Sequence, residues 1–299
     1  MAAEAMLRLQ GPPLSWARPP AVVGLAYHGV VQDRAEALSY YDPHLLTSTA
    51  FFDLQMELVS RWLRPTAAGD VRLSDACQAV VGFDDAFTII LRNAIPTLHR
   101  WRIPATTYVN DATTDGACLW HDVIGSACPS PTAAYHRVRE LKGASVRQVE
   151  EAVAACGGRQ RGPLDRYMSW DELRKWRAEG MEVGGHTTTH YILTYVDDET
   201  REQEVRGNRS AIARNLGVVP ATFAYPNGDH DGPTRQAIKD AGYEFAYEVE
   251  GTGDGTDPLS LPRRNICDAM CTDEDGYFSP ALFLAEITGM VPKPTRSAS

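Results

Sequence analysis

MSWDELRKWRAEGMEVGGHTTTH, residues 168–190, holds a helix signal, a strand signal and a pair of histidines in one continuous stretch. Ser169 is followed three residues later by Glu172, the pattern of a capping box, so we expect a helix to begin here and to end at Gly180. The next run, 181–186, is short and apolar enough for a buried strand. A helix that leads directly into a strand is the repeating unit of parallel β/α folds.

The same alternation continues on both sides of this stretch. Helices are predicted at 49–64 and 86–101, and two more begin near Asp198 and Asp231, each preceded or followed by a short apolar run. Buried strands are predicted, besides 181–186, at 21–28, 79–85, 105–110, 221–226, 243–249 and 259–266. Seven strands separated by helices indicate a parallel α/β architecture.

The chain is predicted to hold one catalytic domain, residues 21–291, of its 299 residues. Within it, 111–168 breaks the regular alternation and is interpreted as a partly helical insertion that shapes the substrate pocket. The segments 1–20 and 292–299 have compositions typical of loosely held termini.

Composition excludes several classes of partner. A formal net charge of −10 argues against the basic surface that nucleic-acid binding needs. The sequence shows no apolar run of the length required for a membrane span and no export signal, so a cytoplasmic protein with reduced cysteines is expected. No membrane partner is expected.

Acidic and imidazole side chains follow two of the predicted strands. Asp84 and Asp85 come directly after the run AVVGF, and His186 and His190 follow the run MEVGG. Because the carboxyl ends of parallel strands meet at one face, we expect Asp85, His186 and His190 to bind one divalent cation, with Asp84 as the general base. The alternative for the acidic pair is a solvated turn in which Asp84 caps a helix.

The identity of the cation follows from its ligands. Two imidazoles and one carboxylate leave positions open for water and substrate, which is typical of hydrolytic zinc sites. Cobalt, nickel and iron accept the same ligands, so zinc is the expected ion and these three are the alternatives.

These residues resemble the motifs of the polysaccharide deacetylases of the NodB homology class, also called carbohydrate esterase family four. The run 83–85 resembles the first motif, although Ala86 stands where the family has glycine, and 168–190 is similar to the second motif and its approach. The run 223–228 resembles a third motif of the form tyrosine-proline-x-glycine. The resemblance implies a distorted (β/α) barrel of about seven parallel strands.

Further roles are implied by the same resemblance. The backbone N–H of Asn227, after Tyr225 and before the glycine of this motif, would stabilise the oxyanion. Arg263 would pair with the base, Asp84, the alternative being a structural ion pair.

The general acid needs a separate assignment. The family's late leucine-x-x-histidine motif is absent from the sequence. The subgroup with an amino-terminal tyrosine-histidine is similar at 27–28, which implies that His28 protonates the leaving nitrogen. The alternative is a packed histidine bonded to a backbone carbonyl.

Three other residues are predicted to line the pocket. Trp120 and His121 lie in the insertion, where related sequences carry a tryptophan near the substrate. His121 also competes with His28 for the role of acid. His230 is a further pocket candidate, with a solvated helix start as its alternative.

The resulting expectation is hydrolysis of an N-acetyl amide on a small soluble amino sugar, with the cation as cofactor. Two alternatives remain: a metal-dependent amidase that cleaves a non-sugar C–N bond, and a catalytically silent carbohydrate-binding barrel. The sugar, the acyl group and the oligomeric state do not follow from the sequence.

Overall fold

The predicted strands close into a parallel barrel in the computed structural model, which describes residues 21–33, 35, 42–75, 77–157, 166–249 and 255–288. All seven expected strands are confirmed. They are β1 (Val22–Tyr27), β5 (Gln78–Phe83), β6 (Ala105–Val109), β7 (Glu182–Gly185), β8 (Thr222–Ala224), β9 (Phe245–Val249) and β10 (Leu261–Asn265). Their carboxyl ends carry the acidic and imidazole motifs.

β1 closes the barrel by pairing with both β10 and β5. Gly24 lies beside Arg263 of β10, and Tyr27 lies beside Phe83 of β5. Three short strands were not predicted: β4 (Arg64–Pro65), which pairs with β5, and the two-stranded sheet of β2 (Gly29–Val31) and β3 (Leu46–Ser48). Runs of two or three residues carry too little periodicity to be recognised.

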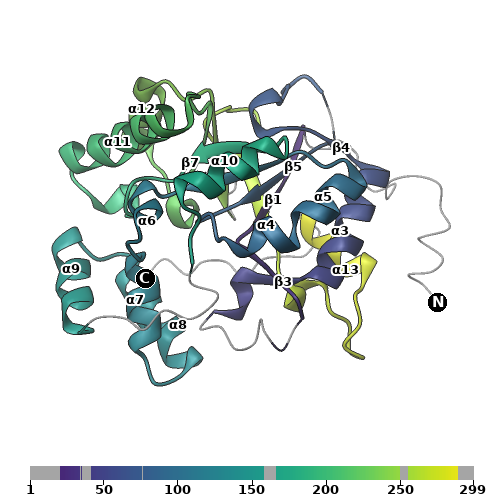
Figure 1. The fold of residues 1–299 in the computed structure, drawn as a ribbon, viewed down its shortest axis with the longest axis horizontal. Helices are drawn as coiled ribbons and strands as arrows, with labels where there is room; N and C mark the ends of the chain where they lie inside the picture. The colour runs from purple at the N-terminus through teal and green to yellow at the C-terminus, as the bar shows by residue number, and fades with distance from the viewer. Residues whose placement is uncertain are drawn as a thin grey trace.

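Helices surround the barrel as Figure 1 shows, with α3, α4, α5 and α13 on one side of the strands and α11 and α12 on another. Ser169 forms the predicted capping box with Glu172, and Gly242 ends α12 in the left-handed conformation. The main helices are α3 (Thr49–Trp62), α4 (Ile89–Asn93), α5 (Ile95–Trp101), α10 (Trp170–Ala178), α11 (Asp198–Leu216), α12 (Gly232–Ala241) and α13 (Pro280–Ile287).

The single helix predicted at 86–101 is wrong, because the segment forms two helices, α4 and α5. Pro96, in the first turn of α5, has no N–H to donate to the preceding turn, which interrupts the helix. The start is also later than expected, because Ala86 has φ +52° and lies outside the helix.

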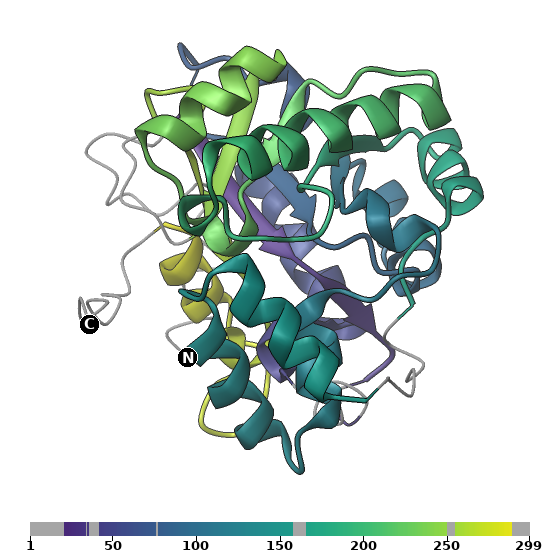
Figure 2. The ribbon, with the colours of Figure 1, turned by 90° about the vertical axis from the view of Figure 1, so that its left-hand side faces the viewer.

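The insertion contributes four helices, which are α6 (Asp111–Thr114), α7 (Trp120–Ala127), α8 (Pro131–Leu141) and α9 (Val146–Ala155). In Figures 1 and 2, α7, α8 and α9 lie together as a separate group beside the barrel. They share an apolar cluster of Trp120, Ile124, Val138, Leu141 and Val149. Residues 158–165 of the predicted insertion, like the predicted terminal segments 1–20 and 292–299, lie outside the described residues.

Two apolar regions hold the barrel and its helices together. Inside the barrel, Tyr108 and Tyr247 pack with small residues of neighbouring strands. Outside it, Phe83 contacts Trp176 of α10 at 5.8 Å between ring centroids. Short 3-10 turns η1 (Pro43–Leu45), η2 (Ala68–Asp70), η3 (Leu193–Tyr195), η4 (Pro226–Gly228) and η5 (Asp268–Cys271) complete the connections.

Among the described helices, none combines the length and the apolar composition that a membrane crossing requires.

Candidate active site

The acidic pair lies at the carboxyl end of β5, where the backbone turns sharply. Asp84 donates its N–H to the carbonyl of Tyr27 at 2.8 Å, so it still follows the strand. Asp85 and Ala86 then adopt φ +64° and +52°, and Met168 donates its N–H to the Ala86 carbonyl at 2.8 Å. Left-handed backbone costs energy for residues with a Cβ and persists where surrounding contacts enforce it, often at functional sites. This turn directs the two adjacent carboxylates to different partners.

The histidine pair lies in the turn that follows β7. The N–H of His186 bonds the Val109 carbonyl at 3.1 Å, and its ring Nδ1 lies 2.7 Å from the Ala224 carbonyl. A carbonyl partner requires a hydrogen on Nδ1, which leaves Nε2 as a ligand atom. Thr187 and His190 have φ +67° and +63°, and the His190 N–H bonds the Thr187 hydroxyl at 3.0 Å. The turn therefore brings His190 back beside His186.

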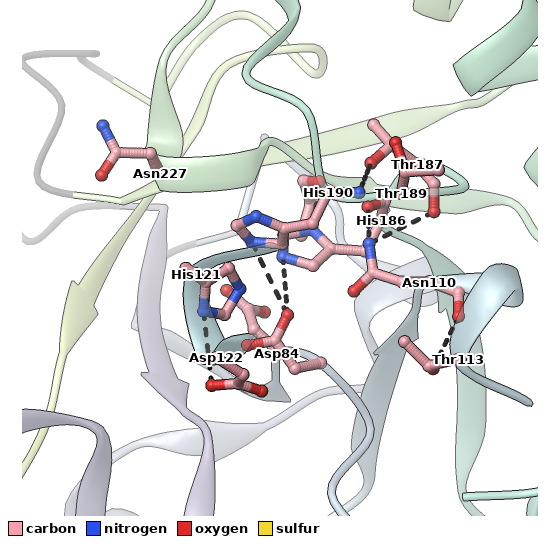
Figure 3. Close-up of polar contacts among 12 residues, drawn as sticks. Asp84, Asn110, Thr113, His121, Asp122, His186, Thr187, Thr189, His190 and Asn227 are labelled. Atoms are coloured by element: carbon pink, nitrogen blue, oxygen red, sulfur yellow. Dashed lines mark hydrogen bonds and ion pairs between the residues drawn. The ribbon is translucent and has the colours of Figure 1, made fainter. Parts of the chain in front are cut away.

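Polar side chains of helix α11 hold this turn in place. Glu204 accepts hydrogen bonds from the N–H and hydroxyl of Thr189 at 2.9 and 2.8 Å. Asn208 donates to the Thr187 carbonyl at 2.8 Å, and Asn110, at the end of β6, donates to the His186 carbonyl. Figure 3 shows Asn110 beside the loop that carries the histidines. None of these supporting residues was predicted from sequence.

Asp85 lies close to both His186 and His190. The Nε2 atoms of His186 and His190 lie 3.7 and 3.6 Å from Oδ1 of Asp85. These distances are long for hydrogen bonds but close to the roughly 3.4 Å that separates two ligand atoms of one tetrahedral zinc ion. Asp85 is 1% exposed, and its Oδ1 has no hydrogen-bond partner within the described part of the chain.

The electrostatics of this group fit a cation. Burial raises the pKa of Asp85 to about 7, and burial lowers the pKa values of His186 and His190. A buried carboxylate without a partner is unfavourable, whereas neutral imidazoles are ready to act as ligands. The donor set suits zinc and equally cobalt, nickel or iron.

Asp84 forms a buried ion pair with Arg263 of β10. Nη1 and Nη2 of Arg263 donate to Oδ1 and Oδ2 of Asp84 at 2.7 and 2.9 Å, which is a bidentate pair between the two residues that the resemblance brings together. Burial raises the pKa of Asp84, but the Arg263 charge and then His186 outweigh burial, so the net pKa is lowered. Asp84 is therefore held as a carboxylate.

The barrel interior leaves room for this arginine. Arg263 is 1% exposed, and its guanidinium carbon lies 5.0 Å from the ring centroid of Tyr108. A Cβ on Gly82 would lie 2.8 Å from the Tyr108 ring and 3.0 Å from Nη1 of Arg263. Glycine is needed at this position of β5 because any side chain would displace the pair.

His28 follows β1 and lies within electrostatic range of the base. Burial lowers the pKa of His28 to about 4, whereas the Asp84 charge acts in the opposite direction. Its Nδ1 is buried without a hydrogen-bond partner among the described residues. The role of His28 as the general acid stays a prediction, with a packed histidine as its alternative.

The third motif forms the turn η4 after β8. Asn227 has φ +59°, and Gly228 donates its N–H to the Tyr225 carbonyl at 2.8 Å. A Cβ on Gly228 would lie 2.4 Å from the Val249 carbonyl oxygen, so only glycine fits. The Asn227 side chain bonds Lys142 and Asp229, at 2.5 and 2.6 Å, and in Figure 3 it lies apart from the histidines.

Tyr225 and His230 contact each other rather than the histidine pair. The Tyr225 hydroxyl donates to the Leu259 carbonyl at 2.9 Å, and its ring lies 4.8 Å from that of His230. His230 Nε2 lies 2.5 Å from Glu248. Both side chains therefore anchor the η4 turn, and a direct role in substrate binding stays a prediction.

Trp120 and His121, from the start of α7, reach the histidine turn. Trp120 donates its ring N–H to the His190 carbonyl at 3.0 Å, and the His121 and His190 ring centroids are 4.7 Å apart. Burial lowers the pKa of His121, but the charge and hydrogen bond of Asp122 outweigh burial and raise it. Figure 3 shows His121 between Asp122 and the other two imidazoles.

A comparison with protein families supports the resemblance drawn from the motifs. The model of the polysaccharide deacetylases matches residues 75–246, more than half of the chain. The chain belongs to the polysaccharide deacetylase family. Family membership makes it a hydrolase of the deacetylase type, and the matched residues span all three motifs.

Solved structures agree on the barrel. A deacetylase from Streptococcus pyogenes, PplD, is 17% identical, with a TM-score of 0.60 over 88% of this chain and 96% of that one. IcaB from Ammonifex degensii is 18% identical, with a TM-score of 0.55 over 90% and 97%. A de-N-acetylase from Aggregatibacter actinomycetemcomitans is 16% identical, with a TM-score of 0.54 over 82% and 95%. Identities this low establish the shared fold alone.

No sequence among the curated proteins matches this polysaccharide deacetylase.

Proposed function

We propose that this protein hydrolyses the N-acetyl amide of a small soluble amino sugar with the help of a divalent cation. The observation that carries the proposal is the division of labour between two adjacent carboxylates. Asp85 lies between two imidazole Nε2 atoms, whereas Asp84 is held by Arg263. One acid is placed to bind a cation, and the other to accept a proton.

Asp85, His186 and His190 would hold the cation, with zinc as the first candidate and cobalt, nickel or iron as alternatives. When bound, the cation supplies Lewis acidity, which polarises the amide carbonyl and makes water more acidic. Oδ1 of Asp85, which is buried and has no hydrogen-bond partner among the described residues, supports this assignment.

Asp84 is proposed as the general base. Its lowered pKa keeps it ionised at neutral pH, and the two hydrogen bonds of Arg263 fix its orientation. It would accept a proton from the attacking water, while the N–H of Asn227 donates a hydrogen bond to the developing oxyanion. The left-handed conformation of Asn227 fixes the direction of that N–H.

His28 is proposed to deliver a proton to the leaving nitrogen. Its pKa of about 4 leaves it neutral at rest and makes it a strong acid once protonated. The proton it delivers would be the one that Asp84 removes from water, so that the overall reaction consumes one water and releases acetate and a free amine. His121, the competing candidate for the acid, lies beside the proposed ligand His190.

Burial of the site supports a small substrate. Asp85 and His186 are each 1% exposed, and Trp120 from the insertion is bonded to the turn that carries His190. An acetylated terminal sugar can reach such ligands more readily than the middle of a polymer. A structurally similar deacetylase, PplD, was solved in complex with acetate, the expected product here. Cytoplasmic location stays a prediction.

The test is release of acetate from N-acetylglucosamine conjugates by the purified, metal-loaded protein. Asp84→Asn should lower kcat by about a thousandfold or more while metal binding and folding persist, because only the base is lost. Asp53→Asn, outside the site, is the matched control. Inertness toward all soluble glycosides together with cleavage of wall polymer would refute the substrate assignment, and inertness toward both would favour a silent barrel or another amide.

A further inference from the structure

His121, which belongs to the insertion, lies beside proposed ligands that follow strands of the barrel. It lies in the first turn of α7 and is 7% exposed. Ligand atoms of Asp85, His121 and His190 lie within 4.8 Å of one another, so His121 groups with two of the three proposed ligands, whereas His186 approaches through Asp85 Oδ1 at 3.7 Å. Edge-to-face packing of the His121 ring on His190 does not by itself explain why a ring nitrogen of His121 lies close to the Asp85 carboxylate.

A buried carboxylate orients the ring. Nδ1 of His121 lies 3.5 Å from Oδ1 of Asp122, which is fully buried. Histidines that bind metals usually donate the hydrogen of their other ring nitrogen to a carboxylate or a carbonyl, which fixes the ring. His186 shows the same arrangement, with Nδ1 held by the Ala224 carbonyl. By the same arrangement Nε2 of His121 would be the ligand atom, and Figure 3 shows the ring lying between Asp122 and the histidine pair.

A neighbouring contact fixes the helix that carries His121. Trp120 donates its ring N–H to the His190 carbonyl at 3.0 Å, and Trp120 itself is part of the apolar cluster shared by α7, α8 and α9. The start of α7 is thereby attached to the turn that carries one proposed ligand. His121 can therefore keep its position relative to the cluster.

We propose that His121 is a fourth protein ligand of the cation, oriented by Asp122, and that the cation attaches the helical insertion to the barrel. This inference rests on the proposed metal-dependent function. Loss of His121 would leave the original three ligands, so binding should weaken rather than disappear.

The test is a titration of the metal-free full-length protein with Co²⁺, followed by its visible absorption. His121→Ala should bind Co²⁺ about 10- to 100-fold more weakly and show a shifted absorption band, because a nitrogen ligand is lost. Asp122→Asn should weaken binding in the same direction by a smaller factor. His136→Ala, an exposed histidine of α8 in the same insertion, should match the wild type.

A second measurement removes the ambiguity of a poorly folded variant. In the wild type, Co²⁺ should slow hydrogen exchange of the amides of α7. In His121→Ala and His121→Gln, Co²⁺ should not slow exchange in α7. The amides around His186 should remain protected in the wild type and in both variants. If Co²⁺ affinity, absorption spectrum and α7 exchange are all unchanged in His121→Ala, this inference is overturned and the proposed metal-dependent function is not. Failure of the wild type to bind Co²⁺ would overturn the proposed metal-dependent function as well.

Discussion

Asp84 and Asp85 are neighbours in sequence, yet their pKa values are shifted in opposite directions. Arg263 lowers the pKa of Asp84 against the effect of burial, whereas burial without a partner raises the pKa of Asp85 to about 7. The cause is geometric, because the left-handed turn at Asp85 and Ala86 separates the two side chains. A pair of identical residues can thus supply an ionised base and an uncompensated ligand.

Removal of the arginine should change the pH dependence of activity. In Arg263→Met, the effect of burial on Asp84 is no longer opposed by the guanidinium, so its pKa rises. The base is active only when ionised, and the acid limb of kcat/KM should therefore move to higher pH, with metal kept saturating. Arg264→Met, the next residue, is the control. An unshifted acid limb would show that Asp84 is not the titrating base.

The affinity for the cation should also depend on pH. Because Asp85 has a pKa of about 7, a cation must displace a proton from it below that pH. Affinity should then fall by about tenfold for each unit of pH below 7 from this group alone, and level off above it. Calorimetric titration with Zn²⁺ at several pH values measures this, and a flat profile would contradict the raised pKa of Asp85 in the metal-free protein.

Ala86 offers a test of backbone strain, because it holds φ +52° where related sequences have glycine. Glycine relieves a left-handed conformation that costs about 1 kcal/mol, which offsets the loss of the buried methyl group. The free energy of unfolding of Ala86→Gly should stay within about 0.5 kcal/mol of wild type. Ala79→Gly, equally buried but within β5, should lose about 1 kcal/mol or more in the same denaturant titration. Equal losses would mean that the turn is unstrained.

At the scale of elements, helix α11 does more than cover the barrel. Glu204 and Asn208 bond the backbone of the histidine turn, so the helix positions the proposed ligands without touching a cation. Burial raises the pKa of Glu204, although its hydrogen bonds from Thr189 act against this. The helix and the turn therefore form one unit.

Loss of this support should weaken metal binding. In Glu204→Ala the N–H and hydroxyl of Thr189 lose their partner, and the affinity for Zn²⁺ should fall by about tenfold or more. Glu204→Gln keeps a hydrogen-bond acceptor for Thr189 and should retain most of the affinity for Zn²⁺. Glu202→Ala, exposed on the same helix, is the matched control for competition titrations. Wild-type affinity in Glu204→Ala would show that the turn holds its shape alone.

The elements also show what sequence can and cannot predict. All seven barrel strands follow from short apolar runs, and the capping box at Ser169 marks a helix start directly. The break between α4 and α5 was missed because apolar spacing continues across Pro96. Supporting contacts such as that of Glu204 lie in ordinary helical sequence, where nothing local distinguishes them from solvated residues.

At the scale of the whole molecule, the site depends on closure of the barrel. Residues from β1, β5, β7, β8 and β10 meet at one end, and the insertion adds His121. Strand-end motifs predicted the three proposed ligands, because a parallel barrel brings its carboxyl ends together, whereas the pair of Asp84 with Arg263 was implied by the family resemblance. The contribution of α7 depends on how the insertion folds back, which the order of residues along the chain does not specify.

The position of Arg263 on β10 has a consequence for how the protein is made. A growing chain that ends before residue 261 already contains Asp85, His186, His190 and the base. It lacks β10, which closes the barrel against β1, and the guanidinium that orients Asp84. Under the proposed function, activity must wait until the last strand leaves the ribosome, because Asp84 has no partner that orients it before then. Chains cut short in that region would keep the proposed ligands but lack an oriented base.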